Sequence, residues 1–310
     1  MVLLAAPRPR WIVFDAVGTL LYPDPPAAAV YHALAAHYGS RLTLAQVARK
    51  LHEQMHPRPA RRRRAGLRSR AGEGCLAAER IGRALLWRPR TSQRREWLRW
   101  QKIVARVLDD VPGAGGRRLF AQLWHHFQQP EHWQLYPEVA SVLTRLKQAG
   151  YRLAVASNFD RRLGDVLRGH PPLACLDAVF VSSELGFSKP DPRFFRAIER
   201  QVHANGPALL LVGDQVICDV AGALACGWQA LLVDRHGHGA LAAIRSLEDL
   251  GPRLAGAAVI PWAATPLASA CSGPGDSRRS EHGRRGHRGS DRDSVSENGR
   301  QSDRPVEPCG

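Results

Sequence analysis

The chain has 310 residues, 44% of them hydrophobic, which suffices for about two domains with buried cores and excludes a wholly disordered protein. It has no long apolar run, its start is too short for a signal peptide and its six cysteines are scattered, so we expect a soluble, cytoplasmic protein without membrane spans, disulfides or a zinc module. The formal net charge of +16 invites a nucleic-acid interpretation, but residues 55–100, with 14 Arg and 3 Glu, supply +11 of it.

The first part of the chain combines one strand with several helices. Residues 11–15 form an apolar run that ends in Asp15 and precedes Gly18 and Thr19, which is typical of a buried strand carrying a carboxylate at its end. Helical composition and periodicity then predict helices over residues 27–38, 43–55, 93–108 and 116–127.

An arginine-rich segment, residues 57–90, lies between two of these helices, and we assign it no secondary structure. Its run Arg61–Arg64 would attract phosphate groups, but such runs are often solvated and no aromatic residues are interleaved for base stacking. We therefore do not expect nucleic acid as a partner. Three interpretations of the segment stay open: a folded part of the helical region, a disordered insert, or an error in the gene model.

From residue 136 the pattern changes to alternating strands and helices. Strands are predicted at residues 152–157, 178–182, 208–213 and 229–234. The helices between and around them are predicted at residues 137–150, 160–169, 192–203 and 215–226. This alternation indicates an α/β fold with a parallel sheet covered by helices on both faces. The tail from residue 266 to 310 is poor in aliphatic residues, so we expect it to be disordered.

Polar residues follow four of the predicted strands. Ligands of an open parallel sheet bind beyond the carboxyl ends of its strands, so these side chains are expected to converge on one crevice. Each residue alone has an ordinary explanation, such as a helix cap or a turn, but their order on successive strands favours a site. In chain order they are Asp15 and Thr19, Ser157 and Asn158, Lys189, and Asp214 with Asp219.

This set resembles the haloacid dehalogenase-like hydrolase superfamily over residues 11–234. The resemblance implies a Rossmann-like core formed by residues 1–21 and 136–265, with a helical cap, residues 22–135, inserted after the first motif. The four motifs are similar to Asp15-Ala16-Val17-Gly18-Thr19, Ala156-Ser157-Asn158, Lys189 with Pro190-Asp191-Pro192, and Gly213-Asp214 through Asp219.

The resemblance also implies a reaction, most simply the hydrolysis of a small phosphoric monoester with Asp15 as the nucleophile. Its oxygen ligands suit Mg²⁺ rather than zinc. The metal would be held by Asp15, Asp214 and the backbone carbonyl of Val17, whereas Asp219 is either a further ligand or an acid in the first turn of a helix. The transferred group would be bound by Ser157, Asn158 and Lys189, with support from Thr19.

Val17 departs from the family pattern. Phosphatases of this superfamily usually have a second aspartate there, and general acid catalysis is typically worth about 10²–10⁴-fold. Valine donates no proton, so a substrate with a good or self-protonating leaving group fits best. A metal-independent 2-haloacid dehalogenase-like hydrolase is one alternative, although the Gly213-Asp214 pair argues against it. A catalytically weak binding protein on the same fold is the other.

Overall fold

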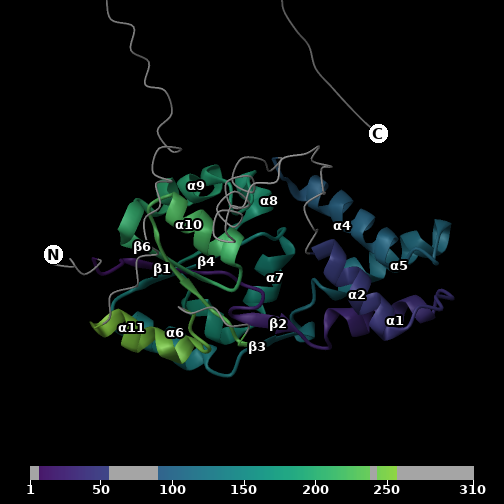
Figure 1. Cartoon of the computed structure of the whole chain (residues 1–310), viewed down its shortest axis with the longest axis horizontal. Coiled ribbons are helices and arrows are strands. Elements are labelled where there is room, and N and C mark those ends of the chain that lie inside the picture. Colours follow the sequence, from purple (N-terminus) through teal and green to yellow (C-terminus); the bar gives the residue numbers. More distant parts are fainter. Residues whose placement is uncertain (1–6, 56–89, 238–242, 257–310) are drawn as a thin grey trace, which may run out of the picture. The chain divides into compact units, whose positions relative to one another are not determined.

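The centre of the protein is a five-stranded parallel sheet in the order β5-β4-β1-β6-β7 (Figure 1). The computed structural model describes residues 7–55, 90–237 and 243–256. The strands are β1 (Trp11–Phe14), β4 (Arg152–Ser157), β5 (Ala178–Val181), β6 (Leu209–Gly213) and β7 (Gln229–Leu232). All of the predicted strands are present and pair in parallel, which confirms the α/β class.

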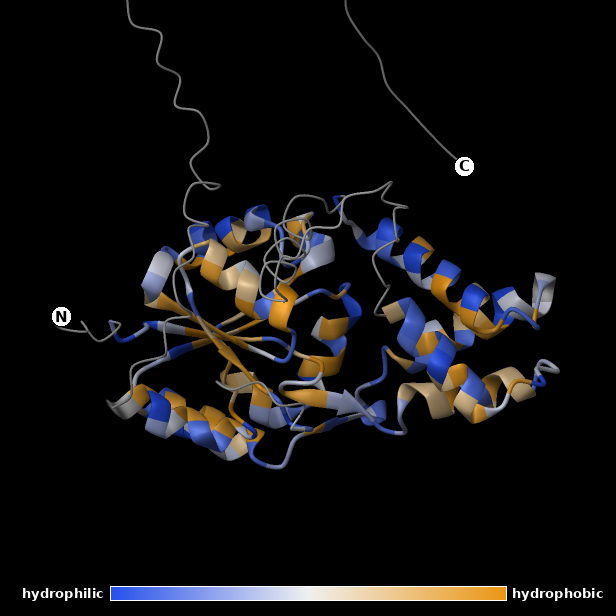
Figure 2. Cartoon of the chain, viewed as in Figure 1, coloured by the Kyte–Doolittle hydropathy of each residue, from blue (hydrophilic) through white to orange (hydrophobic). Residues whose placement is uncertain are grey.

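Helices cover both faces of this sheet (Figure 1). Ile12 and Phe14 of β1 are fully buried in one layer, together with apolar residues of the helices α6 (Val139–Gln148), α7 (Arg162–Arg168) and α11 (Leu250–Gly256). Trp11 and Val13 point into the other layer, which includes residues of α9 (Pro192–Val202) and α10 (Gly222–Ala225). The alternation of side chains along a strand therefore explains why β1 is buried at every position, and Figure 2 shows the mainly hydrophobic strands at the centre of the protein.

Four further helices, which we call the helical insert, have a hydrophobic core of their own. They are α1 (Ala27–Ala36), α2 (Leu44–Met55), α4 (Gln93–Val107) and α5 (Gly113–His126). Val47, Val104 and Leu123 are among the residues buried between them. The arginine-rich segment lies almost entirely, and the predicted tail entirely, outside the described residues. The domain boundaries at residues 21 and 135 stay a prediction.

Short elements were not expected from the sequence. The strands β2 (Leu21–Pro23) and β3 (Trp133–Leu135) pair antiparallel where the chain leaves for the helical insert and returns from it. The predicted helix over 215–226 is instead a π-helical segment, η4 (Val216–Ala221), followed by α10. The remaining short helices are η1 (Pro130–His132), η2 (Pro171–Cys175), α8 (Ser182–Leu185), η3 (Gly206–Ala208) and η5 (Leu247–Asp249). None of the described helices has both the length and the apolar character required to cross a membrane.

Candidate active site

A buried lysine connects the polar groups at the carboxyl ends of the strands. Lys189 is 1% exposed, and its Nζ donates to Oδ1 of Asp15 and Oδ1 of Asp219, both at 2.6 Å, and to the carbonyl oxygen of Ala156 at 2.8 Å. An ammonium group has three protons to donate, so these acceptors use its full capacity. Burial lowers the pKa of Lys189, but attraction to Asp15 and Asp219 outweighs burial and holds that pKa above its usual range.

Three carboxylates, Asp15, Asp214 and Asp219, form an acidic cluster in which one oxygen atom of each lies within 4.8 Å of the other two. Burial raises the pKa of Asp214 to about 7, and the charges of Asp15 and Asp219 act in the same direction. Burial also raises the pKa of Asp219 to about 6, against the opposing effect of Lys189. When ionised, the three carboxylates carry more negative charge than the one ammonium group neutralises. They therefore form an all-oxygen donor set with a net negative charge. This set fits a hard divalent cation such as Mg²⁺.

Two glycines allow these carboxylates to approach the backbone. Gly18 has a φ of +87°, and a Cβ atom there would lie 2.5 Å from Oδ2 of Asp214. At Gly213 a Cβ atom would lie 2.3 Å from Oδ2 of Asp219. No side chain fits at such distances, so the cluster requires glycine at both positions.

Asp219 has the helix-start contact that the sequence offered as one of its two roles, whereas its role as a metal ligand stays a prediction. Its Oδ2 accepts the backbone N–H of Gln215 at 3.0 Å, as an acid near a helix start does, while its Oδ1 contacts Lys189. Asn158 also holds Lys189, because its side-chain amide donates to the Lys189 carbonyl at 2.9 Å and accepts the Lys189 N–H at 2.7 Å. Both residues thus fix the lysine from its two ends.

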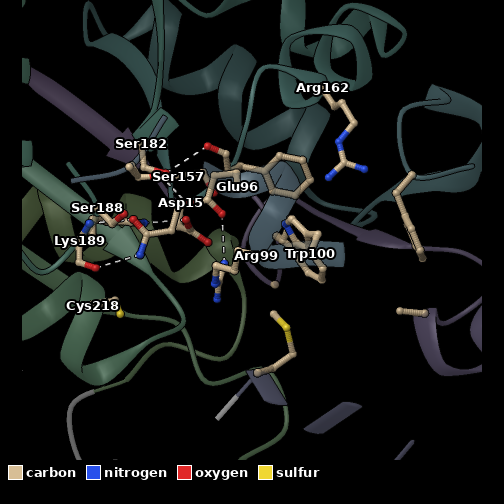
Figure 3. A pocket seen from close by; sticks show the side chains of 18 of the residues that line it. Asp15, Glu96, Arg99, Trp100, Ser157, Arg162, Ser182, Ser188, Lys189 and Cys218 are labelled. Carbon is tan, nitrogen blue, oxygen red and sulfur yellow. Dashed lines mark hydrogen bonds and ion pairs between the residues drawn. The ribbon is translucent and has the colours of Figure 1, made fainter. Parts of the chain in front are cut away.

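The predicted site residues lie around one cavity of about 980 Å³, which the helical insert also lines (Figure 3). Thr19 and Asp219 are not among its described lining residues; both are buried behind it. The Oγ1 atom of Thr19 has no hydrogen-bond partner within the described part of the chain. The predicted residues that line the cavity are Asp15, Val17, Ser157, Asn158, Lys189 and Asp214.

The helical insert contributes polar residues that sequence reasoning missed. Glu96 and Arg99 of α4 line the cavity, with Arg99 Nη1 3.2 Å from Oε2 of Glu96 (Figure 3). Glu96 is 7% exposed, and its Oε1 accepts a hydrogen bond from Thr91 Oγ1 at 2.5 Å. Charged residues on an amphipathic helix are ordinarily solvated, so no local signal distinguished these from their neighbours.

Arg235, which follows β7, was also missed. Its Nη2 donates to the Thr19 carbonyl at 2.6 Å and its Nε to the Gly18 carbonyl at 3.3 Å. Its Nη1 pairs with Oε1 of Glu138 at 2.7 Å, and its guanidinium lies 3.5 Å from the centre of the Tyr136 ring. Burial raises the pKa of Glu138, but the hydrogen bond from Arg235 outweighs it and lowers that pKa overall. Arg235 thus fixes the loop that follows Asp15.

Comparison with known proteins agrees with this geometry. Haloacid dehalogenase-like hydrolase domain-containing protein 3 of Mus musculus is 36% identical over 142 residues, which cover 45% of this chain and 56% of that protein. Phosphoserine phosphatase of Thermus thermophilus is 30% identical over 142 residues, covering 44% of this chain and 54% of that protein. The chain therefore spans about half the length of these curated relatives.

A solved structure and a family profile extend the match. The HAD-hydrolase YfnB of Bacillus subtilis, solved with magnesium bound, is 18% identical, and the match covers 80% of this chain and 100% of that chain with a TM-score of 0.57. At that identity the likeness concerns the fold. The sequence profile of the haloacid dehalogenase-like hydrolases matches residues 9–227, well over half of the chain. The chain therefore belongs to the haloacid dehalogenase-like hydrolase family.

Proposed function

We propose that the protein is a Mg²⁺-dependent phosphatase that hydrolyses phosphoric monoesters of small molecules, with Asp15 as the nucleophile. The observation that carries this proposal is the acidic cluster around Lys189, in which Asp214 and Asp219 add negative charge beyond what one lysine neutralises. Displacement of a halide places no phosphoryl charge in the site and needs no such surplus. A cytoplasmic location belongs to the same proposal and rests on the scattered cysteines.

The reaction proceeds in two displacements. A carboxylate oxygen of Asp15 bonds to phosphorus while the ester P–O bond breaks, and the bonding electron pair leaves with the substrate oxygen. A water oxygen then attacks phosphorus, the bond between phosphorus and Asp15 breaks, and the carboxylate and inorganic phosphate are released as the water proton passes to solvent. Dividing the hydrolysis in this way replaces one difficult step by two easier ones.

The residues around Asp15 have distinct tasks in this scheme. Mg²⁺, when bound, supplies positive charge against the negative charge of the phosphoryl group. Asp15, Asp214 and the carbonyl of Val17 would hold it, and Asp219 stands behind them. Lys189 holds the Asp15 carboxylate through its 2.6 Å contact and adds a second positive charge at the site. Ser157, at the end of β4, lines the cavity where its hydroxyl binds phosphoryl oxygens.

The names of two similar proteins support the proposal. One relative is a phosphoserine phosphatase, and the similar solved structure holds magnesium. Two structural features agree with a densely charged site. The Thr19 hydroxyl has no hydrogen-bond partner among the described residues, and two glycines admit Asp214 and Asp219.

The test is hydrolysis of p-nitrophenyl phosphate with Mg²⁺ and with EDTA, using the parent chain, Asp15→Asn and the control Asp165→Asn on α7. We expect the parent chain to turn over the substrate in Mg²⁺ but not in EDTA. The rate should fall about 10⁴-fold or more in Asp15→Asn and stay at the parental value in the control. An Asp15→Asn chain as active as the parent would contradict the mechanism.

Val17 favours a second candidate, a metal-independent dehalogenase, because a departing halide needs no proton. Release of chloride from 2-chloropropionate in EDTA, abolished by Asp15→Asn, would establish it in place of the phosphatase. Absence of both reactions in well-folded protein would indicate a binding role for the fold.

A further inference from the structure

We propose that the substrate is an aryl phosphate, a monoester whose leaving oxygen is attached directly to an aromatic ring. This inference rests on the proposed phosphatase function and specifies the substrate class of the same cavity. Two independent features carry it. One is the aromatic lining of the cavity, and the other is Val17, which lines the cavity near Asp15 and has no proton to donate.

An arc of four aromatic side chains lines the cavity from the strand ends into the helical insert. Phe159 follows Ser157 and Asn158 directly, so the arc begins beside the predicted phosphate-binding residues. Successive ring centres are 6.1 Å apart from Phe159 to Trp133, from Trp133 to Phe127 and from Phe127 to Tyr31. These tilted and edge-on contacts form a continuous chain of rings along the cavity wall, in which Tyr31 and Trp133 are 2% and 4% exposed.

Three more aromatic residues, Trp100, Phe120 and Trp124, line the cavity from α4 and α5. The Arg162 guanidinium lies 3.4 Å from the centre of the Trp124 ring and pairs with Asp160 at 2.8 Å, so its charge is already neutralised. A volume of about 980 Å³ is at the upper end for sites that hold small organic molecules. A short polar alcohol phosphate would leave this apolar lining largely uncovered.

Val17 leads to the same class of substrate by a chemical argument. It lines the cavity with Asp15, and valine cannot protonate a leaving oxygen. An aryl oxygen resembles the tyrosine hydroxyl, whose pKa is about 10, whereas an alkyl oxygen is closer to water at about 15.7. The carboxyl of Glu96 does not replace the missing acid, because it is paired with Arg99.

The proposed step is balanced without an enzymatic acid. The bond from Asp15 oxygen to phosphorus forms, the bond from phosphorus to the aryl oxygen breaks, and both electrons of that bond leave on the aryl oxygen. The product departs as a phenolate and takes its proton from solvent. The ring that contacts the aromatic arc is thus also the leaving group that tolerates Val17.

The first experiment separates the leaving group from the ring. Phenyl, benzyl and glycerol phosphates are compared in Mg²⁺, because benzyl phosphate has a ring but an alkyl leaving oxygen. We expect kcat for phenyl phosphate to exceed that for benzyl phosphate by about 100-fold, within the range of general acid catalysis. We expect KM for benzyl phosphate to be about tenfold below that for glycerol phosphate. Equal kcat and KM values across the three would overturn the inference and leave the phosphatase function standing.

The second experiment tests the two features separately. Trp100→Ala should raise KM for 1-naphthyl phosphate about tenfold, whereas Trp97→Ala, on the same helix but 39% exposed and not among the described lining residues, should not. Val17→Asp should shrink the phenyl-to-benzyl ratio of kcat about tenfold by supplying an acid. Equal KM changes in both tryptophan variants, or an unchanged ratio, would contradict the proposal.

A binding measurement covers the case in which no phosphate ester is hydrolysed and the proposed function fails. The affinities of the Asp15→Asn chain for 1-naphthyl phosphate and for glycerol phosphate are then measured by calorimetric titration, which tests whether the cavity prefers an aromatic phosphate. An affinity about tenfold higher for the naphthyl compound, lost when Trp100→Ala is added, supports an aromatic phosphate as the ligand. Equal affinities overturn it.

Discussion

The strand ends and the helical insert line one cavity but hold their charges differently. At the strand ends, the side chains of Lys189 and Asp15 are 2% and 7% exposed and 2.6 Å apart. In the helical insert, Lys50 and Asp109 approach to 2.5 Å with side chains 20% and 59% exposed. The strand ends thus fix reacting groups by buried contacts, whereas the insert supplies shape and apolar surface. Changes at the strand ends should alter whether the reaction occurs, and changes in the insert should alter which substrate fits.

Replacement of the two lysines is expected to give the largest contrast. Lys189→Met leaves Asp15 and Asp219 buried without a cation, and breaking such a pair costs about 3–5 kcal/mol of unfolding free energy. Activity should fall at least about 10³-fold. Lys50→Met should leave Tm and activity near parental values. Urea unfolding in EDTA and phosphatase assays measure both, and equal losses in the two variants would refute the contrast.

Two glycines have nearly the same φ but different surroundings. Gly18 has a φ of +87° and lies against Asp214. Gly39, between α1 and α2, has a φ of +82°, and no atom of the described residues lies within 4 Å of the place that a Cβ would take. Gly39→Ala should cost only the left-handed backbone penalty of roughly 1–2 kcal/mol. Gly18→Ala should cost about 1–3 kcal/mol more through the clash with Asp214, and should weaken Mg²⁺ binding. Equal unfolding free energies would mean that the close approach is unimportant.

Arginine-to-lysine changes test positioning with charge preserved. Lys cannot reproduce the planar set of bonds by which Arg235 holds the Gly18 and Thr19 carbonyls. Arg235→Lys should lower kcat about tenfold and raise the Mg²⁺ concentration required for thermal stabilisation. Arg99→Lys, in the cavity wall, should change KM by a small factor instead. A fall in Tm without any change in Mg²⁺ dependence would indicate a purely structural role for Arg235.

The smallest expected effect is on the pH dependence of stability in EDTA. The folded pKa values of Asp214 and Asp219, about 7 and 6 against an ordinary 3.8, mean that the folded chain binds these protons more tightly than the unfolded chain. Stability should therefore fall as pH rises from 5 to 7. Asp177 and Glu138, whose pKa values are lowered, are already ionised in that window.

Burial lowers the pKa values of His126 and His170, which adds stability as pH rises and opposes the aspartates. The aspartate effect is therefore the difference between two profiles: from pH 5 to 7, Tm of the parent should fall relative to Tm of Asp214→Asn by a few degrees, and saturating Mg²⁺ should reverse this difference. Parallel profiles of the two chains would contradict the prediction.

The longer elements were predictable because their patterns are strong. Each strand of the parallel sheet is a short apolar run bounded by polar or turn residues, and β4 (Arg152–Ser157) has the predicted bounds. The three-residue strands β2 and β3 are too short to show a period. The segment after Gly213 follows helical composition but forms wider π-helical turns, in which Cys218 and Asp219 are buried. Such turns are frequent at functional sites, where a local need outweighs propensity.

The part of the candidate site that could be predicted consists of residues that directly follow a predicted strand, because the carboxyl ends of parallel strands lie at one edge of the sheet. Asp15, Ser157, Lys189 and Asp214 were expected in one crevice, and the structure brings them to one cavity. Glu96 and Arg235 were not expected, because each belongs to a segment whose local pattern is ordinary for a helix surface or a loop. The partners of Arg235, the Gly18 and Thr19 carbonyls, lie far away in the chain. Glu96 pairs with the nearby Thr91 and Arg99, and only the folded structure brings it to the cavity.

The fold class and the set of strand-end groups follow from hydrophobic periodicity and motif spacing, which are local properties of the chain. What those groups contact depends on the folded structure. It placed Lys189 between Asp15 and Asp219, put Arg235 on the carbonyls of Gly18 and Thr19, and lined the cavity with aromatic residues of the helical insert. Each of these contacts joins residues distant in sequence, and such pairings follow from how buried surfaces pack in three dimensions rather than from any local pattern.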